Sequence, residues 1–297
     1  MITEMQTIDL HTHGAGGYDT RTTEPEHILK IARLHGSRGV SAIIPTIYSA
    51  TVKVMREQME VVKEAMRLQS GSNVEDTDED GAVPAKILGV HLEGPFLNPV
   101  KAGALNAITF INASEYAFQE LTDGFEDIVK IMTVAPEIEN SRTLIKKISD
   151  AGIKVNMGHS DATYQEAERG YNAGAKGITH LFNAMRGFQH REPGLAGFGL
   201  LHNDIYIELI ADPYHLHAAT LDLVFRVKNH DRIIVVSDSV RETLTWLRGE
   251  LSDSRGTLIG GSMAVTDAAK RLVDEGFEAD TINACVSDNP LRYLDLR

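Results

Sequence analysis

The chain has 297 residues, of which 42% are hydrophobic and 24% charged, and its formal net charge at pH 7 is −13. This composition is typical of a globular protein that buries a large core, rather than of a disordered or fibrous chain. The negative charge argues against a nucleic-acid partner, since nucleic-acid binding depends on clustered lysine and arginine. A metal ion or a small-molecule substrate fits the charge better.

Cysteine content and hydropathy indicate where the protein works. Cys285 is the only cysteine, so the chain has neither a disulfide framework nor a thiolate zinc knuckle. The amino-terminal residues MITEMQTIDL contain no basic segment followed by a long apolar run. No stretch approaches the roughly 18 apolar residues of a membrane-spanning helix. We therefore expect a cytoplasmic protein that does not bind membranes.

Eight short runs rich in β-branched residues alternate with segments of helical spacing. The expected strands are 7–13, 39–48, 86–94, 127–137, 153–160, 176–182, 204–212 and 232–239. Expected helices between them include 24–36, 51–69, 139–152 and 163–174. Eight such alternations predict an α/β fold, a (β/α)8 barrel of the TIM type. Such barrels typically have roughly 250 residues, so we expect residues 1–297 to form a single domain.

Two further segments are interpreted as structural. Residues 69–85 are acidic, contain glycine and serine and lack periodicity, which predicts a solvated surface loop. Trp246, the only tryptophan, either caps a pocket or packs a loop, and packing is the preferred interpretation.

Polar side chains gather where the expected strands end, which is where the active site of a parallel barrel forms. These residues are His11, His13, His91, Glu93, His159, Ser160, His180, Asn183, Asp212, His215, Ser237 and Asp238. Taken singly, a histidine after a strand is usually a hydrogen-bonded loop or core residue, and an aspartate is often a helix cap. Their convergence on one rim instead favours a metal site.

His11 and His13 are separated by one residue, so on a strand they face the same side and can bind one ion. Imidazole nitrogens and carboxylate oxygens suit zinc or another first-row divalent metal, with an open coordination position for water. Gly14, Gly16 and Gly17 allow the following loop to pass close to the ion or the substrate.

Motifs along nearly the whole chain match a known family. They are IDLHTHG, GVHLEGPFLNPVKAG, TVAPE, GHSDATY, THLFNAMRGFQHREPGLAG, IADPYHLH, VVSDS and GTLIGGSMAVTDAAKRLV. On these motifs the sequence resembles the amidohydrolase superfamily and, more closely, the N-acetylglucosamine-6-phosphate deacetylases. THLFNAM followed by REPGLAG is highly specific for the deacetylases, whereas HxH occurs across the superfamily. The resemblance implies a barrel of the metal-dependent hydrolase kind that converts N-acetylglucosamine 6-phosphate to glucosamine 6-phosphate and acetate, in amino-sugar catabolism.

The resemblance also implies a role for each matched residue. The principal metal ligands are Glu93, His159 and His180, while His11 and His13 can hold a second ion that Glu93 bridges. Asp238 is the catalytic acid and base. The substrate-binding residues are Asn183, Ala184, Arg191, His215, Leu258, Ile259 and Gly260. The implied cofactor is one or two divalent ions, zinc first, with iron, manganese or cobalt compatible with the same ligands. A homodimer is expected.

Three features differ from the family pattern, one of which is that residues 240–255 are shorter than the family's hairpin. Leu105 stands where family members have a histidine, and leucine cannot donate a hydrogen bond. Either His91 or His215 substitutes for that histidine, or activity on the usual substrate is weak. Only six residues precede the first expected strand, so we expect the barrel to lack the small β-sandwich domain that family chains usually carry.

Two other functions stay open at this stage. The same chemistry could act on another N-acyl substrate, such as N-acetylgalactosamine 6-phosphate or an unphosphorylated compound. Replacing Arg191 discriminates here, because only a phosphorylated substrate should lose much binding. A non-catalytic descendant that binds a sugar phosphate is the other possibility, and a turnover measurement separates it from an enzyme.

Overall fold

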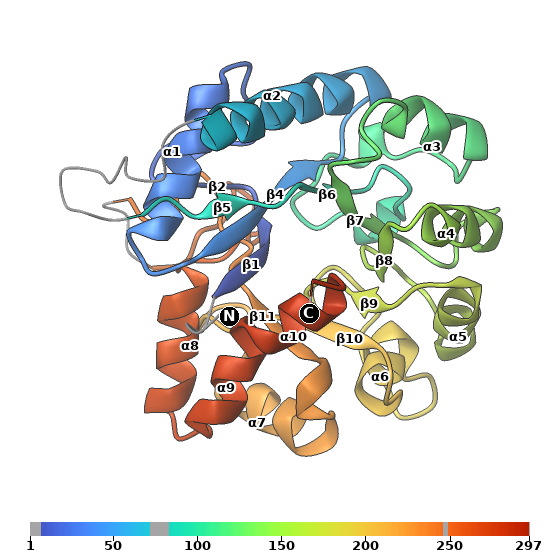
Figure 1. Cartoon of the computed structure of the whole chain (residues 1–297). Coiled ribbons are helices and arrows are strands. Elements are labelled where there is room, and N and C mark those ends of the chain that lie inside the picture. The colour runs from blue at the N-terminus through green and yellow to red at the C-terminus, as the bar shows by residue number, and fades with distance from the viewer. Residues whose placement is uncertain (1–6, 72–82, 246–248, 297) are drawn as a thin grey trace.

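The computed structural model describes residues 7–71, 83–245 and 249–296 as a barrel of parallel strands surrounded by helices (Figure 1). Neighbouring strands pair in the order β1 (Ile8–Thr12), β4 (Ala42–Tyr48), β6 (Val90–Glu93), β7 (Val129–Val134), β8 (Lys154–Met157), β9 (Gly177–Ile178), β10 (Tyr206–Ile210) and β11 (Ile233–Val236). The short strand β5 (Lys86–Ile87) also pairs with β4, so β5 and β6 together occupy the third expected strand. All eight expected strands are therefore confirmed.

The first and last strands close the barrel through their carboxyl ends rather than through a full ladder. Thr12 and Ser239 form an isolated parallel bridge. The Asp238 amide donates to the His11 carbonyl at 2.9 Å, and the His13 amide donates to the Ser239 carbonyl at 2.7 Å. Closure thus places His11, His13 and Asp238 side by side on one rim.

Ten helices are present in the described residues, and all but the last, α10, lie on the outside of the barrel. They are α1 (Pro25–Gly36), α2 (Val52–Gly71), α3 (Glu115–Thr122), α4 (Ser141–Asp150), α5 (Tyr164–Ala173), α6 (Gly194–Leu201), α7 (Ala218–Val227), α8 (Val265–Asp274), α9 (Ala279–Val286) and α10 (Asp288–Tyr293). Short 3-10 turns occur at Pro99–Lys101, Ala107–Thr109 and His230–Arg232. The four expected helices are confirmed with bounds within two residues. The hairpin β2 (Gly14–Ala15) and β3 (Tyr18–Asp19) was not expected.

Local sequence explains why these helices begin where they do. Pro25 occupies the first turn of α1, where its missing amide donor costs nothing. Thr163 and Glu166 form a reciprocal capping box at the start of α5. In the part of the chain that the structure describes, no helix combines the length and apolarity needed to cross a membrane.

Two apolar clusters fill the structure, one between the sheet and the helices and the other inside the barrel. The inner cluster contains Ile8 and Leu10 of β1, Ile234 and Val236 of β11, and Tyr293 of α10. Helix α10 lies across the end of the barrel where the strands begin (Figure 1). The strand end opposite to α10 therefore carries the polar rim.

Strand β1 contains an irregularity that matters for this rim. Ile8 and Asp9 lie opposite Ala42 and Ile43, but Thr12 lies opposite Pro45, so β1 has one extra residue. Strict alternation from Ile8 and Leu10 would turn His11 away from the interior. The extra residue lets His11 follow Leu10 on the inner side.

Two of the interpretations above concern segments outside the described residues. Within the proposed loop 69–85, α2 continues to Gly71, and residues 72–82 are outside the described part. Trp246 is also outside it.

Candidate metal centre and substrate cleft

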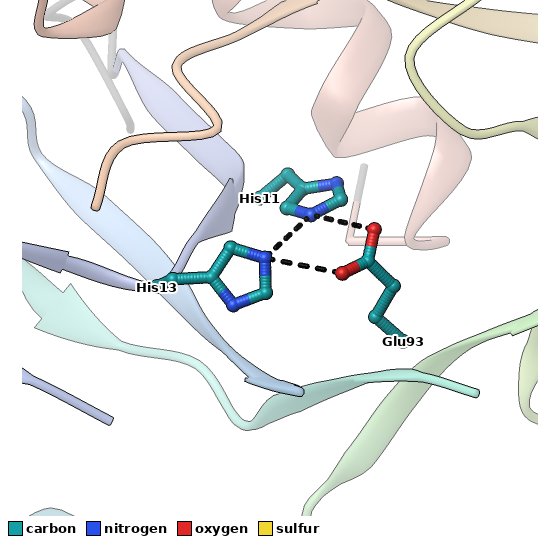
Figure 2. A group of neighbouring side chains, drawn as sticks. All are labelled: His11, His13 and Glu93. Carbon is teal, nitrogen blue, oxygen red and sulfur yellow. Dashed lines mark hydrogen bonds and ion pairs between the residues drawn. The ribbon is translucent and has the colours of Figure 1, made fainter. Parts of the chain in front are cut away.

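Glu93, at the carboxyl end of β6, faces His11 of β1 and His13, which directly follows that strand (Figure 2). The Nε2 atom of His13 lies 3.2 Å from Glu93 Oε2, and that of His11 lies 3.5 Å from Glu93 Oε1. The two Nε2 atoms are 3.2 Å apart. All three side chains are buried, so the cluster is shielded from bulk water. The expected convergence of His11 and His13 is present.

Glu93 also faces two histidines from later strands. The Nε2 atoms of His159, after β8, and His180, after β9, each lie 3.1 Å from Glu93 Oε1. These two nitrogens are 3.2 Å from each other. Glu93 therefore belongs to two three-residue groups whose ligand atoms are close enough to hold an ion.

The backbone at the rim is strained. His159, His180 and Asp238 have φ angles of 47°, 31° and 47°, which residues with a Cβ rarely adopt. Each such residue costs on the order of 1–3 kcal/mol, and this kind of strain clusters at functional sites. The strain supports a functional role for these strand ends.

The hydrogen bonds of the ring nitrogens show whether the cluster suits a cation. Nδ1 of His13 contacts the Thr46 carbonyl at 3.1 Å, and Nδ1 of His159 contacts the Lys101 carbonyl at 2.9 Å. A carbonyl only accepts, so Nδ1 carries a proton, and Nε2 is the atom of each ring that can offer a lone pair to an ion in place of a proton. Lone pairs that face each other and a carboxylate repel unless a cation lies between them. The residues present therefore fit a divalent metal ion.

Asp238 lies on the β11 side of the same cluster. Its Oδ1 is 3.4 Å from Nε2 of His11 and 3.5 Å from Nε2 of His13. Burial, followed by the negative charges of Glu93 and Glu208, raises the pKa of the Asp238 carboxyl well above its usual value. This carboxyl is thus poised to bind a proton beside the cluster.

His11 and Glu93 differ in their charge state within the cluster. Burial lowers the pKa of His11 well below its usual value, outweighing the attraction of Glu93, so the ring is neutral at pH 7. Burial alone would raise the pKa of Glu93, but the charge of His159 and hydrogen bonds from His13, His159 and His180 outweigh it and lower that pKa. Glu93 is therefore the ionised member of the cluster.

A cleft of about 680 Å³ opens above the cluster. Its walls include six of the seven expected substrate-binding residues, namely Asn183, Ala184, His215, Leu258, Ile259 and Gly260. Arg191 is exposed and is not among the residues that line the cleft. Leu105 lines the cleft beside Gly103 and Ala104. The assigned roles stay predictions, but the cleft brings most of these residues to the metal cluster.

His215 is held in place by a dense set of hydrogen bonds. Its Nδ1 lies 3.0 Å from Asp212 Oδ2, which also accepts the amide of Ser262 at 2.9 Å. Burial acts to raise the pKa of Asp212, yet the hydrogen bond and charge of His215 and the backbone donors lower it to about 2. Asp212 thus fixes His215 and the turn that follows Gly260.

Three other rim residues lie beneath or beside the cleft instead of lining it. His91 is buried, with Nε2 2.8 Å from Thr133 Oγ1. Ser160 donates to Glu137 at 2.7 Å, and the amide of Ser237 donates to Asp9 at 3.1 Å. The positions of Ser160 and Ser237 are those of structural residues. The buried position of His91 makes it a poor substitute for the family histidine at Leu105.

Three residues of the site were missed in the sequence. Tyr48 stacks on His13 with ring centroids 3.7 Å apart, and Arg21 lies 4.3 Å from the Tyr48 ring centroid on the cleft wall. Glu208, inside β10, contacts Nδ1 of His11 at 3.2 Å. The signal for Glu208 was a carboxylate in the otherwise apolar run YIELI. Tyr48 ends a predicted strand, as the other rim residues do.

Comparisons with known proteins agree with this geometry. No protein-family model matches the chain. It is 31% identical to the N-acetylglucosamine-6-phosphate deacetylase of Vibrio furnissii, covering 89% of this chain and 66% of that protein. It is 34% identical to the protein of the same name from Bos taurus, covering 97% of this chain and 73% of that protein. The crystal structure of the Thermotoga maritima N-acetylglucosamine-6-phosphate deacetylase superposes with a TM-score of 0.84 at 29% identity, covering 98% and 78% of the two chains.

Proposed function

The chain belongs to the N-acetylglucosamine-6-phosphate deacetylase family, and from that premise we propose that it hydrolyses the acetamido group of N-acetylglucosamine 6-phosphate. The products are glucosamine 6-phosphate and acetate. The observation that carries the proposal is the convergence of Glu93, His159 and His180 with Asp238 at the floor of a cleft that the matched motifs line. The chain spans 66% of the Vibrio furnissii relative, so the activity is proposed for this chain on its own residues.

Two overlapping groups would hold the metal. Glu93, His159 and His180 form the principal site, and His11, His13 and Glu93 form a second site that shares the carboxylate. Zinc is the proposed ion, because the donors are imidazole nitrogens and carboxylate oxygens. When bound, such an ion lowers the pKa of a water from about 15.7 towards 7 and polarises a carbonyl oxygen.

Asp238 moves the proton. Its carboxylate accepts a proton from the water that attacks the acetamido carbonyl carbon and returns it to the departing amine nitrogen. The carbon–nitrogen bond breaks as that proton arrives. The oxygen of the water is then part of acetate, and a proton of the water is on the amine nitrogen. The raised pKa of Asp238 favours holding the proton between these two transfers.

The cleft walls orient the sugar. His215, fixed by Asp212, contacts the sugar or the scissile amide, and the turn of Leu258, Ile259 and Gly260 lines the substrate. Asn183 and the backbone of Ala184 bind the sugar phosphate together with Arg191, whose planar guanidinium suits an oxyanion. Arg191 lies outside the cleft wall here, so its side chain must turn inward when phosphate binds.

The test is acetate release by the purified, zinc-loaded chain supplied with N-acetylglucosamine 6-phosphate. Unphosphorylated N-acetylglucosamine is the matched substrate control, and chelator-treated protein is the metal control. Release that requires both phosphate and metal supports the proposal. A folded, metal-loaded chain that releases no acetate contradicts it. In that case a substitution of Leu105→His shows whether the missing family histidine is the cause.

Three properties accompany this function as predictions. The protein works in the cytoplasm, it forms a homodimer, and residues 1–297 act as one barrel domain. Size-exclusion chromatography with light scattering measures the second of these directly.

A further inference from the structure

The two ring nitrogens of His11 have different surroundings. Nε2 faces the nitrogen of His13 and the carboxylate of Glu93, and Nδ1 points away from both (Figure 2). Nδ1 lies 3.2 Å from Oε2 of Glu208, which comes from β10, two strands from β1 around the closed barrel. His11 and Glu208 are both buried.

Glu208 is itself held by a defined partner. Its second oxygen, Oε1, accepts a hydrogen bond from the Asn156 side-chain amide at 2.7 Å. The hydroxyl of Tyr293 donates to the other end of that amide, Asn156 Oδ1. Asn156 and Tyr293 are buried, so these contacts lie inside the barrel and out of water.

The chemistry of the groups indicates the direction of each hydrogen bond in the series that runs from Tyr293 to His11. The Tyr293 hydroxyl donates to an amide oxygen, the Asn156 amide nitrogen donates to a carboxylate, and the carboxylate can only accept. When Glu208 is ionised, Nδ1 of His11 is the donor to it, and this hydrogen bond fixes the neutral tautomer with its lone pair on Nε2. That lone pair points at His13 and Glu93, where the proposed ion binds.

We propose that Glu208 is a positioning residue for the metal centre: it fixes the tautomer and ring orientation of His11, and Asn156 and Tyr293 hold it in that role. This role rests on the proposed metal site, since His11 is a ligand only if an ion binds there. A carboxylate behind a ligating histidine also makes that ligand more basic. Helix α10, at the far end of the barrel, is thereby connected to the metal site through side chains of β8 and β10.

A competing arrangement uses some of the same residues. His11, His91 and Glu208 are close enough to hold an ion themselves, and His91 Nδ1 has no partner within the described part of the chain. However, both oxygens of Glu208 already accept hydrogen bonds, and an ion there would require the Nδ1 proton of His11 to leave. The satisfied network favours the positioning role.

The test measures metal affinity without substrate, so its result is separate from whether the chain deacetylates anything. Metal-free parent and Glu208→Gln proteins are titrated with Zn²⁺ against a chromophoric chelator, and the Co²⁺ forms are compared by absorption spectroscopy. Glutamine keeps the size of the side chain but removes its charge. We expect one ion to bind about 10–100-fold more weakly in Glu208→Gln, with an altered cobalt spectrum.

Two more variants make the result decisive. Thr133→Val is the matched control, because Thr133 is buried in the same barrel interior and bonds to His91 and Thr179, not to Glu208. It should keep the parental zinc affinity. Tyr293→Phe keeps the aromatic ring but removes the hydroxyl that donates to Asn156. It should lower the affinity for the same ion by a smaller factor than Glu208→Gln does.

Several outcomes would overturn the proposal. One is parental zinc affinity in Glu208→Gln, and another is an equal loss in Thr133→Val. If Glu208→Gln does not fold, parental affinity in Tyr293→Phe counts against the proposal. An ion lost in Glu208→Gln but retained in His13→Asn would place that ion at the competing group of His11, His91 and Glu208. If the parent binds a single ion, the comparison applies to that ion.

Discussion

Replacing Asp238 with asparagine separates proton transfer from metal binding. Asparagine has nearly the same shape but cannot accept and return a proton at neutral pH. Asp238 Oδ1 lies 3.4 Å from His11 Nε2, whereas the principal metal group consists of Glu93, His159 and His180. The variant should therefore keep at least the principal ion while losing nearly all hydrolysis.

The size of the loss follows from the role assigned to the carboxyl. A positioned acid and base contributes about 10²- to 10⁴-fold to the rate. At about 1.36 kcal/mol for each factor of ten, that corresponds to about 3–5 kcal/mol of transition-state stabilisation. The loss should appear in kcat, with at least the principal zinc ion still bound.

The same substitution has a second, opposite effect on the metal-free protein. The pKa of Asp238 is raised in the folded state, so folding disfavours its ionised form. This penalty is present at pH values above the folded pKa and disappears as the pH falls below the unfolded value of about 3.9. Metal-free Asp238→Asn should therefore unfold at a higher temperature than the parent near pH 7.5, with a smaller difference near pH 4.5.

Acetate release, zinc analysis and thermal unfolding with chelator measure the three effects on the same preparations. Full hydrolytic activity in Asp238→Asn would refute the acid and base role. Loss of all zinc from a folded variant would show that Asp238 mainly holds the ion. A metal-free variant less stable than the parent at pH 7.5 would refute the electrostatic reasoning.

Three more substitutions test other parts of the structure. Burial raises the pKa of Asp9 to about 6, so the folded protein loses stability as the pH rises from about 4 to 6 and Asp9 ionises. In urea unfolding, Asp9→Asn should therefore add up to about 3 kcal/mol to the free energy of unfolding at pH 7.5 and little at pH 4. Arg191→Ala should raise KM about 10–100-fold for the phosphorylated sugar only; if Arg21→Ala alone shows that loss, Arg21 binds the phosphate instead. Phe198 is fully buried and packs edge-on against Tyr164. Phe198→Ala should therefore lower the free energy of unfolding of the zinc-bound protein by about 3–5 kcal/mol. A change below about 1 kcal/mol would mean that neighbouring side chains move to fill the cavity left by the ring.

The sequence by itself determined the strands, four of the helices and most of the metal cluster. Strands and helices differ in the period of their apolar residues, which is a local property. A parallel barrel brings the carboxyl ends of its strands to one rim, so polar residues at those ends could be collected without coordinates. Glu93, His159 and His180 were found in this way, and they do meet.

Only the tertiary structure decided how the side chains around that cluster are arranged. The extra residue in β1 keeps His11 inside the barrel after Leu10, and it depends on pairing with β4. The contact of Glu208 with His11 joins residues 197 positions apart, and Arg191 falls outside the cleft although its motif is specific. Neither fact is visible in a local pattern, because which distant side chains touch is set by how the closed barrel aligns its strands.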